Sequence, residues 1–303
     1  MKTNMTYCGF ISLLGRTNVG KSTLLNRLIG RKISITSKRK QTTRNRILGI
    51  VTEGCYQSIY IDTPGCDSNK KVLNILMNSI TRRTLSEVSI VIFMVVGTTW
   101  TSEDKRVLSW LQDKEIPVIL VINKIDIIDN KSLLLPHLQF LNQQKNFIDI
   151  IPISALTGFN VDKLAKITRK FLPLSKHIYA PEFFTDQPIN FTIAEIIREK
   201  LIRVLGDEIP YSLKVKIEKF YVKKDDYCII YALIMVHQTS HKKIIIGING
   251  NKIKNIGIKA RFEIEKIMKL KVYLKLWIKV QNRCPADEII LPTRKILLSL
   301  EKN

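Results

Sequence analysis

The segment Gly15-Arg16-Thr17-Asn18-Val19-Gly20-Lys21-Ser22-Thr23 decides the fold of the first half of the chain. It fits the pattern G-x-x-x-x-G-K-[ST] between an apolar run at 10–14 and a helical pattern at 22–30. Its glycines let successive backbone N–H groups point at phosphate oxygens, and a helix N-terminus favours the same anion. We predict a phosphate-binding loop formed by all nine residues, in which Lys21 neutralises phosphate charge and Ser22 ligates Mg²⁺. A chance match in an ordinary loop is the alternative.

Short, continuous apolar runs alternate with amphipathic stretches through the first half of the chain. The runs are rich in β-branched residues, which is typical of strands covered on both faces of a parallel sheet. Strands are predicted at 10–14, 58–61, 90–96, 118–122 and 150–153, and helices at 22–30, 72–85, 103–114 and 131–145. This alternation predicts a doubly wound α/β domain.

A second chemical box follows the strand predicted at 58–61, with the sequence Asp62-Thr63-Pro64-Gly65. A carboxylate at a strand end can hold Mg²⁺ through water, and the Gly65 N–H can sense the γ-phosphate. Ligands of doubly wound sheets bind beyond the carboxyl ends of the strands. This box therefore falls where the phosphate-binding loop predicts its ligand.

Two further boxes concern the base. Asn123-Lys124-Ile125-Asp126 follows the strand at 118–122, and Ser154 and Ala155 follow the strand at 150–153. The Asp126 carboxylate can accept hydrogen bonds from the ring N–H and the amine of guanine, a donor pair that adenine lacks. A backbone N–H of Ser154 or Ala155 can meet the guanine O6 atom. The four boxes together predict a GTP site.

Composition places the chain among globular proteins. It has 303 residues, 45% of them hydrophobic and 25% charged, which excludes a fibrous or disordered protein. No apolar run reaches the ~18 residues typical of a membrane span, and the N-terminus lacks the pattern of a secretory signal. The five cysteines are scattered and odd in number. We expect a reduced cytoplasmic chain without a disulfide framework or zinc site.

The net charge is the unusual feature of the composition. Lys and Arg number 49 against 26 Asp and Glu, which gives +23. The excess indicates a polyanionic partner, either nucleic acid or an anionic membrane surface, and codon bias is the alternative. Residues 31–46 hold seven basic residues and no acid, and residues 242–279 hold eleven basic and two acidic residues, hence 11 − 2 = +9. Codon bias alone does not predict this clustering.

The second half of the chain follows a different pattern. Three prolines in 173–190 predict a linker between a first domain at 1–172 and a second at 191–303. Helical spacing follows at 191–205, where Thr192 and Glu195 are expected to form part of a capping box. Strands are predicted at 213–222 and 227–237 with a polar turn between them, then a glycine-bounded loop after the apolar run 242–247, a helix at 251–268 and a strand at 271–280. This order predicts a small α+β domain.

The glycine-bounded loop is Gly247-Ile248-Asn249-Gly250. G-x-x-G between structural elements resembles the loop with which KH domains clamp single-stranded nucleic acid, and an ordinary turn is the alternative. A basic residue is common inside such loops and is missing here, so we expect phosphate contacts from Lys252 and Lys254. We interpret the aromatic residues of this domain as core residues rather than as base-stacking platforms, namely Phe262, Tyr273 and Trp277.

The four boxes resemble those of the translation-factor-like GTPases, and the wording of 15–30, 33–50 and 135–162 resembles the bacterial Era family over essentially the whole chain. The resemblance implies a P-loop GTPase domain followed by a type II KH domain. It also implies GTP and GDP, the 3′ region of 16S rRNA and the 30S ribosomal subunit as partners. A monomer with peripheral contact to the cytoplasmic face of the inner membrane is expected.

The resemblance also assigns roles to further residues. A threonine between residues 32 and 46 completes the magnesium shell; Thr43 is our choice and Thr42 the rival. The family has proline at the position of Thr17 and an aliphatic residue at the position of Cys66. We count Thr17 and Cys66 among the predicted GTP-binding residues. No glutamine orients the attacking water here, so intrinsic hydrolysis should be slow. In related GTPases that lack this glutamine, an asparagine at the position of Asn18 helps to bind K⁺. The alternative is that Asn18 is only a turn residue.

Pro292 interrupts the expected last helix, so the segment after Cys284 departs from the family. The alternative function is an RNA-binding assembly chaperone that binds GTP but does not need its turnover.

Overall fold

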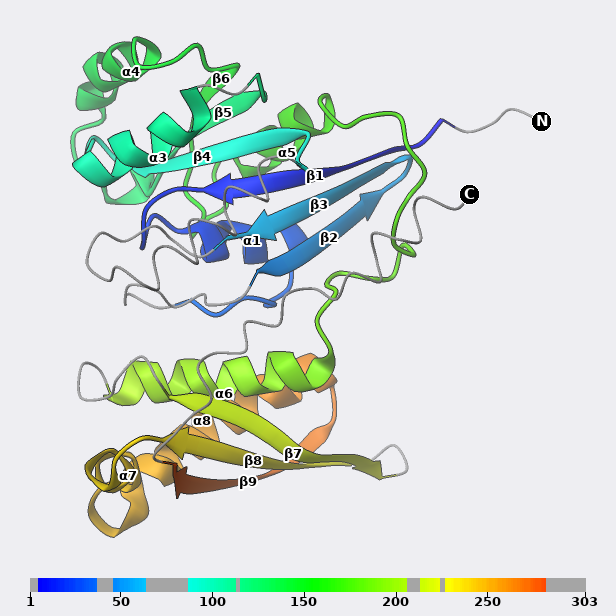
Figure 1. Ribbon diagram of the computed structural model, residues 1–303, viewed down its shortest axis with the longest axis vertical. Coiled ribbons are helices and arrows are strands. Elements are labelled where there is room, and N and C mark those ends of the chain that lie inside the picture. The colour runs from blue at the N-terminus through cyan, green and yellow to red at the C-terminus, as the bar shows by residue number, and fades with distance from the viewer. Residues whose placement is uncertain are drawn as a thin grey trace. The chain divides into compact units, whose positions relative to one another are not determined.

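The chain forms two units in the computed structural model, Met1–Gln187 and Pro188–Asn303 (Figure 1). The structure describes residues 5–36, 46–63, 87–112, 115–205, 213–223 and 227–281. The predicted helix at 72–85, the threonines 42 and 43, the residues 64–66 and the segment after Cys284 lie outside the described residues.

The first unit is built on a six-stranded sheet with the order β2-β3-β1-β4-β5-β6. Its strands are β1 (Tyr7–Leu14), β2 (Ile47–Glu53), β3 (Tyr56–Asp62), β4 (Ile90–Val96), β5 (Val118–Asn123) and β6 (Asp149–Pro152). All neighbouring pairs are parallel except β2 and β3, which are antiparallel. The continuous apolar runs of β4 and β5 are buried almost throughout, as strands covered on both faces should be. The doubly wound prediction is confirmed, whereas strand β2 was missed.

The helices of the first unit follow the strands closely. They are α1 (Lys21–Ile29), α3 (Ser102–Gln112), α4 (Leu134–Asn142) and α5 (Val161–Arg169), with single 3₁₀ turns η1 (Ile125–Ile127) and η2 (Lys131–Leu133). Apolar residues of α3 and α4 pack with β4 and β5 in one buried cluster. Helix α1 contacts α5, β2 and β3. The sheet and its helices thus fix the loops at the carboxyl ends of β1, β3 and β5.

Residues 173–187, within the range predicted to be a linker, lie against the first unit. The Cys8 N–H donates to the Pro173 carbonyl at 3.1 Å, and the Ile50 N–H donates to the Phe184 carbonyl at 3.0 Å. The fully buried Gln57 side chain accepts from the Tyr179 N–H at 3.0 Å and donates to the Tyr179 carbonyl at 2.7 Å. These contacts fix most of the segment to β1, β2 and β3. The domain limits stay a prediction.

The second unit packs helices on one face of a three-stranded sheet with the order β7-β8-β9. Its elements are α6 (Ile189–Leu205), β7 (Lys214–Lys223), β8 (Tyr227–Val236), α7 (Thr239–Ile246), the 3₁₀ turn η4 (Ile248–Gly250), α8 (Asn251–Met268) and β9 (Lys271–Val280). Strand β8 runs antiparallel to β7 and parallel to β9. Buried residues of α6, α7, α8 and the sheet share one core. Helix α7 includes the run 242–246, which sequence analysis did not interpret as a helix.

The start of α6 differs from the prediction. The helix begins at Ile189, so Thr192 lies within its first turns and is buried. The Glu195 carboxylate accepts two hydrogen bonds at 2.7 Å from Arg198. The expected capping box between Thr192 and Glu195 is therefore wrong, because the carboxylate is already paired within the helix. Among the described residues, no helix has the length and apolar character needed to cross a membrane.

Candidate nucleotide-binding and nucleic-acid sites

At two positions of the loop between β1 and α1, the backbone conformation and the close neighbours leave room only for glycine. Gly20 caps α1 with a φ of 104°, and a Cβ there would overlap the Asn123 amide. Gly15 has a φ of 149°, and its Cβ would lie 2.5 Å from the Met94 carbonyl oxygen. Both residues therefore bring the loop into direct contact with β4 and the end of β5, and any side chain would force it away.

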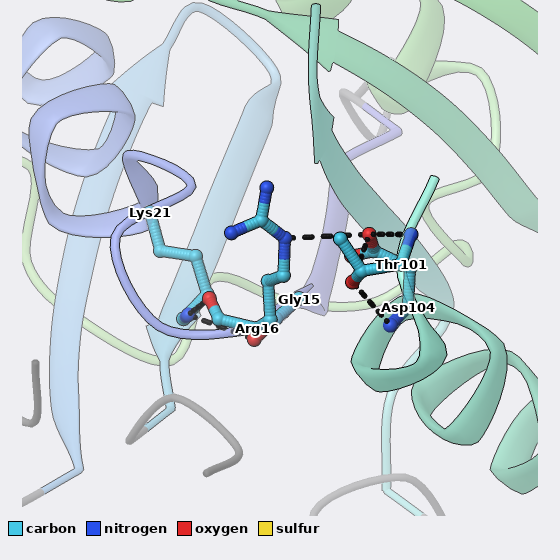
Figure 2. A network of polar contacts seen from close by, with 5 residues as sticks. All are labelled: Gly15, Arg16, Lys21, Thr101 and Asp104. Atoms are coloured by element: carbon cyan, nitrogen blue, oxygen red, sulfur yellow. Dashed lines mark hydrogen bonds and ion pairs between the residues drawn. The ribbon is translucent and has the colours of Figure 1, made fainter. Parts of the chain in front are cut away.

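Lys21 is almost fully buried within this loop, at 6% exposure. Its Nζ atom donates to the carbonyl oxygens of Gly15 at 2.9 Å and Arg16 at 2.8 Å (Figure 2). Such contacts hold the ammonium group inside the curl of the backbone, where a phosphate would meet both the charge and the N–H groups.

Arg16 connects the loop to the start of α3 (Figure 2). Its Nε atom lies 3.3 Å from Asp104 Oδ2, and the Asp104 side chain is fully buried. The same oxygen accepts from the Thr101 N–H at 3.0 Å and the Thr101 hydroxyl at 2.8 Å. Sequence analysis missed this anchor, although T-x-x-D before an amphipathic stretch resembles a capping box and was available as a signal.

The predicted magnesium ligands of the first and second boxes lie together. Ser22 Oγ donates to Asp62 Oδ2 at 2.6 Å, and Asp62 ends β3 fully buried. Ser34, which the sequence did not single out, donates to the same oxygen at 3.0 Å. Hydroxyl and carboxylate oxygens are the donors that Mg²⁺ prefers, so this set fits the ion. The neighbouring Thr63 hydroxyl instead donates to the Leu13 carbonyl at 2.8 Å and so fixes the strand end.

Asn123 joins the phosphate-binding loop to the base-side loop. Its side-chain amide donates to the Val19 carbonyl at 2.7 Å, and its oxygen accepts from the Ala155 N–H at 2.9 Å. The Ser154 N–H donates to the Phe159 carbonyl at 3.2 Å. Both N–H groups predicted to meet guanine O6 thus have partners in this structure, and that contact stays a prediction. A residue that sequence analysis missed, Arg27 of α1, supports this loop through the carbonyls of Ala155 and Leu156.

The rest of the base-side box is open to a ligand. Asp126 is exposed within η1, next to the half-buried Ile125, and Lys124 has a left-handed φ of 64°. Burial lowers the pKa of Lys124, the nearby Arg16 lowers it further, and Asp126 opposes both effects. The Lys124 ammonium thus senses the charges of both Arg16 in the phosphate-binding loop and Asp126 in the base-side box.

The remaining residues of the phosphate-binding loop differ in burial and backbone conformation. Thr17 and Val19 are buried, Thr23 is half-buried in α1, and Asn18 is exposed with a left-handed φ of 63°. Asparagine is among the residues that tolerate this conformation, so the geometry agrees with the turn interpretation of Asn18 and does not test its role toward K⁺.

The predicted nucleic-acid loop connects α7 to α8. Gly247 and Gly250 have φ values of 69° and 75°, Asn249 has 51°, and Ile248 is 84% exposed. A Cβ at Gly247 would lie 2.7 Å from the Lys252 side chain, so the two are in close contact. The first turn of α8 has no acidic residue. The loop is therefore exposed beside a helix N-terminus that favours phosphate.

The interpretation of three aromatic residues as core is wrong. Tyr273 is 63% exposed, Phe262 is 55% exposed and Trp277 is 38% exposed. Tyr273 and Trp277 occupy the polar phase of the alternation in β9, whose other phase provides the buried residues. An aromatic residue in an amphipathic strand follows the phase of that strand, and the phase was readable from the sequence.

Comparisons with known proteins identify the families that the two halves of the chain match. Residues 10–124 match the family model described as 50S ribosome-binding GTPase, and residues 208–283 match that of the KH domain. The chain is 50% identical to GTPase Era of Yersinia enterocolitica over 93% of its own length and 94% of that protein. Two crystal structures are 38% identical, each covering 91% of this chain and 94% of the other. A variant of Aquifex aeolicus Era bound to GDP·AlF4⁻ has a TM-score of 0.86. Era with MgGDPNP and nucleotides 1506–1542 of 16S ribosomal RNA has a TM-score of 0.85.

Proposed function

Because this chain belongs to the Era family of GTPases, we propose that it couples its GTP cycle to binding of the 3′ region of 16S rRNA in assembly of the 30S subunit. The nucleotide part rests on one observation: the Asn123 side chain donates to the Val19 carbonyl and accepts from the Ala155 N–H. One buried side chain thereby links the loop proposed for the phosphates to the loop proposed for guanine.

The proposed roles follow from the positions of the side chains. Backbone N–H groups of the loop 15–20 and the Lys21 ammonium bind the phosphates, and Asp126 selects guanine through its ring N–H and amine. Ser22 and Asp62 would hold Mg²⁺, with Thr43 completing the shell. When bound, the ion would neutralise charge that develops on the phosphates. The hydrogen bonds that Lys21 makes with the loop hold its charge in place before the ligand arrives.

Slow intrinsic hydrolysis is part of the proposal, because the sequence has no glutamine to orient water. We further propose that Asn18 contributes to a K⁺ site that speeds hydrolysis. Turnover should then be faster in K⁺ than in Na⁺ at equal ionic strength, and Asn18→Ala should remove that difference while GTP still binds. Equal rates in both salts for the unsubstituted protein would refute the role of K⁺.

The RNA part of the proposal rests on the loop 247–250 and the helix that follows it. A relative's crystal structure holds nucleotides 1506–1542 of 16S rRNA, which supports the same target here. Exposed Ile248, left-handed Asn249 and the N-terminus of α8 give a backbone that a phosphate chain can approach closely.

The decisive experiment measures the affinity of the full chain for a 16S 3′-end oligonucleotide with GTP, with GDP and without nucleotide, while GTP turnover is followed. We expect different affinities in the three states. Lys21→Ala should lose tight GTP binding and make the three affinities equal, whereas Lys166→Ala, at an exposed position of α5, should behave as the unsubstituted protein. Equal affinities in the unsubstituted protein would contradict coupling. If 30S assembly proceeds normally when a non-hydrolysable GTP analogue replaces GTP, the chaperone alternative would be favoured, because GTP turnover would then be dispensable.

Peripheral membrane contact and a monomeric state belong to the proposal as well. The net charge of +23 gives generic support for contact with anionic lipid. Flotation with phosphatidylglycerol vesicles tests the contact, and sedimentation equilibrium tests the monomer.

A further inference from the structure

The sheet of the second unit has two chemically different faces. Even-numbered residues of β8 and β9 point into the core with α6 and α8, as the buried cluster shows. The odd-numbered residues of these strands, together with the residues of β7 that pair with them, make the opposite face, here called the outer face. In Figure 1 helices α6 and α8 lie on one side of this sheet.

The outer face carries many lysines. Along β9, the exposed residues Lys271, Lys275 and Lys279 alternate with Tyr273 and Trp277. Four lysines of β7 pair in register with outer-face residues of β8: Lys214, Lys216, Lys219 and Lys223. The only acidic residue of the three strands is Glu218, at the bulge where the register shifts. The outer face is therefore strongly positive.

Aromatic rings lie between these lysines. Tyr227 and Tyr273 are in edge contact, with ring centroids 5.4 Å apart, and Tyr231 and Trp277 are 5.7 Å apart. The pairing register gives two rows across the sheet in which a tyrosine has a lysine on each side, Lys223–Tyr227–Lys271 and Lys219–Tyr231–Lys275. Lys275 Nζ lies 5.5 Å from the centre of the Tyr231 ring.

We propose that this outer face is a second RNA-contacting surface, which binds single-stranded RNA by stacking bases on its rings and pairing phosphates with its lysines. Bases stack on exposed tyrosine and tryptophan whatever their identity, and lysines beside the rings meet the phosphates that connect stacked bases. A sheet with aromatic residues on its open face is one established way to hold splayed RNA bases. Cross-strand packing explains the ring pairs alone, but it does not explain why lysines flank them in register.

A lipid surface is the competing partner, since aromatic and basic residues also gather at membrane interfaces. Interfacial binding inserts a wide apolar face among the headgroups. Here lysines alternate with the rings along β9, and four of the five cross-strand rows of the outer face hold a lysine, so the same patch would have to bury several ammonium groups. The alternation of ring and charge matches the alternation of base and phosphate instead. The outer face shares no residue with the loop 247–250, so this inference holds or fails independently of the function proposed for that loop.

Trp277 offers a direct test, because the other two tryptophans, Trp100 and Trp110, lie in the first unit. The full chain is titrated with an unstructured 12-nucleotide oligoadenylate, and the emission of Trp277 is obtained by subtracting that of Trp277→Phe. Base stacking should quench this emission. The double variant Lys275→Glu/Lys279→Glu keeps the rings and should weaken binding at least tenfold, and Tyr231→Ala/Tyr273→Ala should do the same. Circular dichroism confirms that each variant is folded.

Two controls separate the outer face from other surfaces. Lys163→Glu/Lys166→Glu, at exposed positions of α5, is the charge-matched control and should leave the quenching of Trp277 intact, because these residues lie in the first unit. Absence of quenching in the unsubstituted protein, or binding that Lys163→Glu/Lys166→Glu weakens as much as Lys275→Glu/Lys279→Glu does, would overturn the inference. A blue shift of Trp277 emission with phosphatidylglycerol vesicles, without quenching by RNA, would assign the face to membrane instead.

Discussion

The phosphate-binding loop holds a buried threonine, Thr17, at the position where the family resemblance implies proline. Thr17 is 4% exposed, and its Oγ1 atom has no hydrogen-bond partner among the described residues. A buried hydroxyl without a partner costs about 1–3 kcal/mol. Thr17→Val keeps the shape and removes the hydroxyl, so the nucleotide-free protein should unfold at an equal or higher temperature, by up to a few degrees. Calorimetry measures this, and a clear loss of stability would show that the hydroxyl is bonded.

Asp126 is the residue that we propose selects guanine. Asp126→Asn places a donor where guanine presents its amine and xanthine presents a carbonyl, so preference should change from GTP to XTP. Because Asp126 is exposed, its substitution should not disturb folding, so a changed preference would reflect the base contact itself. Competition binding with both nucleotides measures the preference. Asp129→Asn, exposed in the same loop, is the matched control and should stay selective for GTP. Unchanged selectivity in the Asp126 variant would remove this residue from the base site.

At the scale of residues, sequence motifs predicted which groups meet but not how they are held. Ser22 and Asp62 were expected together because both follow strands of one sheet edge, and they lie 2.6 Å apart. Three other contacts come from tertiary structure, since each joins residues 28 or more apart in the sequence: Ser34 with Asp62, Arg27 with Ala155, and Arg16 with Asp104. No local pattern could have predicted those pairings.

At the scale of elements, β2, α5 and α7 were missed, and the reasons for β2 and α7 differ. Strand β2 pairs antiparallel with β3 at the edge of the sheet, and only its first half is a continuous buried run. Helix α7 ends in Ile244, Ile245 and Ile246, β-branched residues that favour a strand by propensity. Packing of Ile245 into the core overrides that preference. Elements with strong periodicity, such as α8 and β9, were predicted within a residue of their bounds.

The loop between α7 and α8 gives an element-scale prediction. Ile248→Asp/Asn249→Asp places two negative charges where a phosphate should approach, so affinity for the 16S 3′-end oligonucleotide should fall at least tenfold. Aspartate tolerates the left-handed backbone of Asn249, so little strain is added. Ile248→Asn is the uncharged control and should bind nearly as the unsubstituted protein does. If the charged and uncharged variants bind equally well, the loop does not contact phosphate.

The net charge of the whole molecule can be a compositional bias or a binding device, and matched substitutions distinguish the two. Lys252, Lys254 and Lys259 lie on α8, after the proposed RNA loop, and Lys163, Lys166 and Lys170 lie on or beside α5 in the first unit. Both triple changes to alanine remove three positive charges. Phosphate contacts set the dependence of affinity on salt, with a slope of about −0.7 for each charge on a single strand.

The α8 triple variant should therefore reduce the slope of log affinity against log salt concentration by about two, and it should weaken RNA binding at low salt far more than at high salt. The α5 triple variant should leave the slope unchanged, because its charges are in the unit to which we assign GTP rather than RNA. Fluorescence titrations with the 16S 3′-end oligonucleotide between 50 and 200 mM KCl, roughly the range over which such contacts respond, measure both slopes. Equal reductions in the two variants would mean that binding responds to total charge alone, so the clustering of basic residues in 242–279 would lose its functional interpretation.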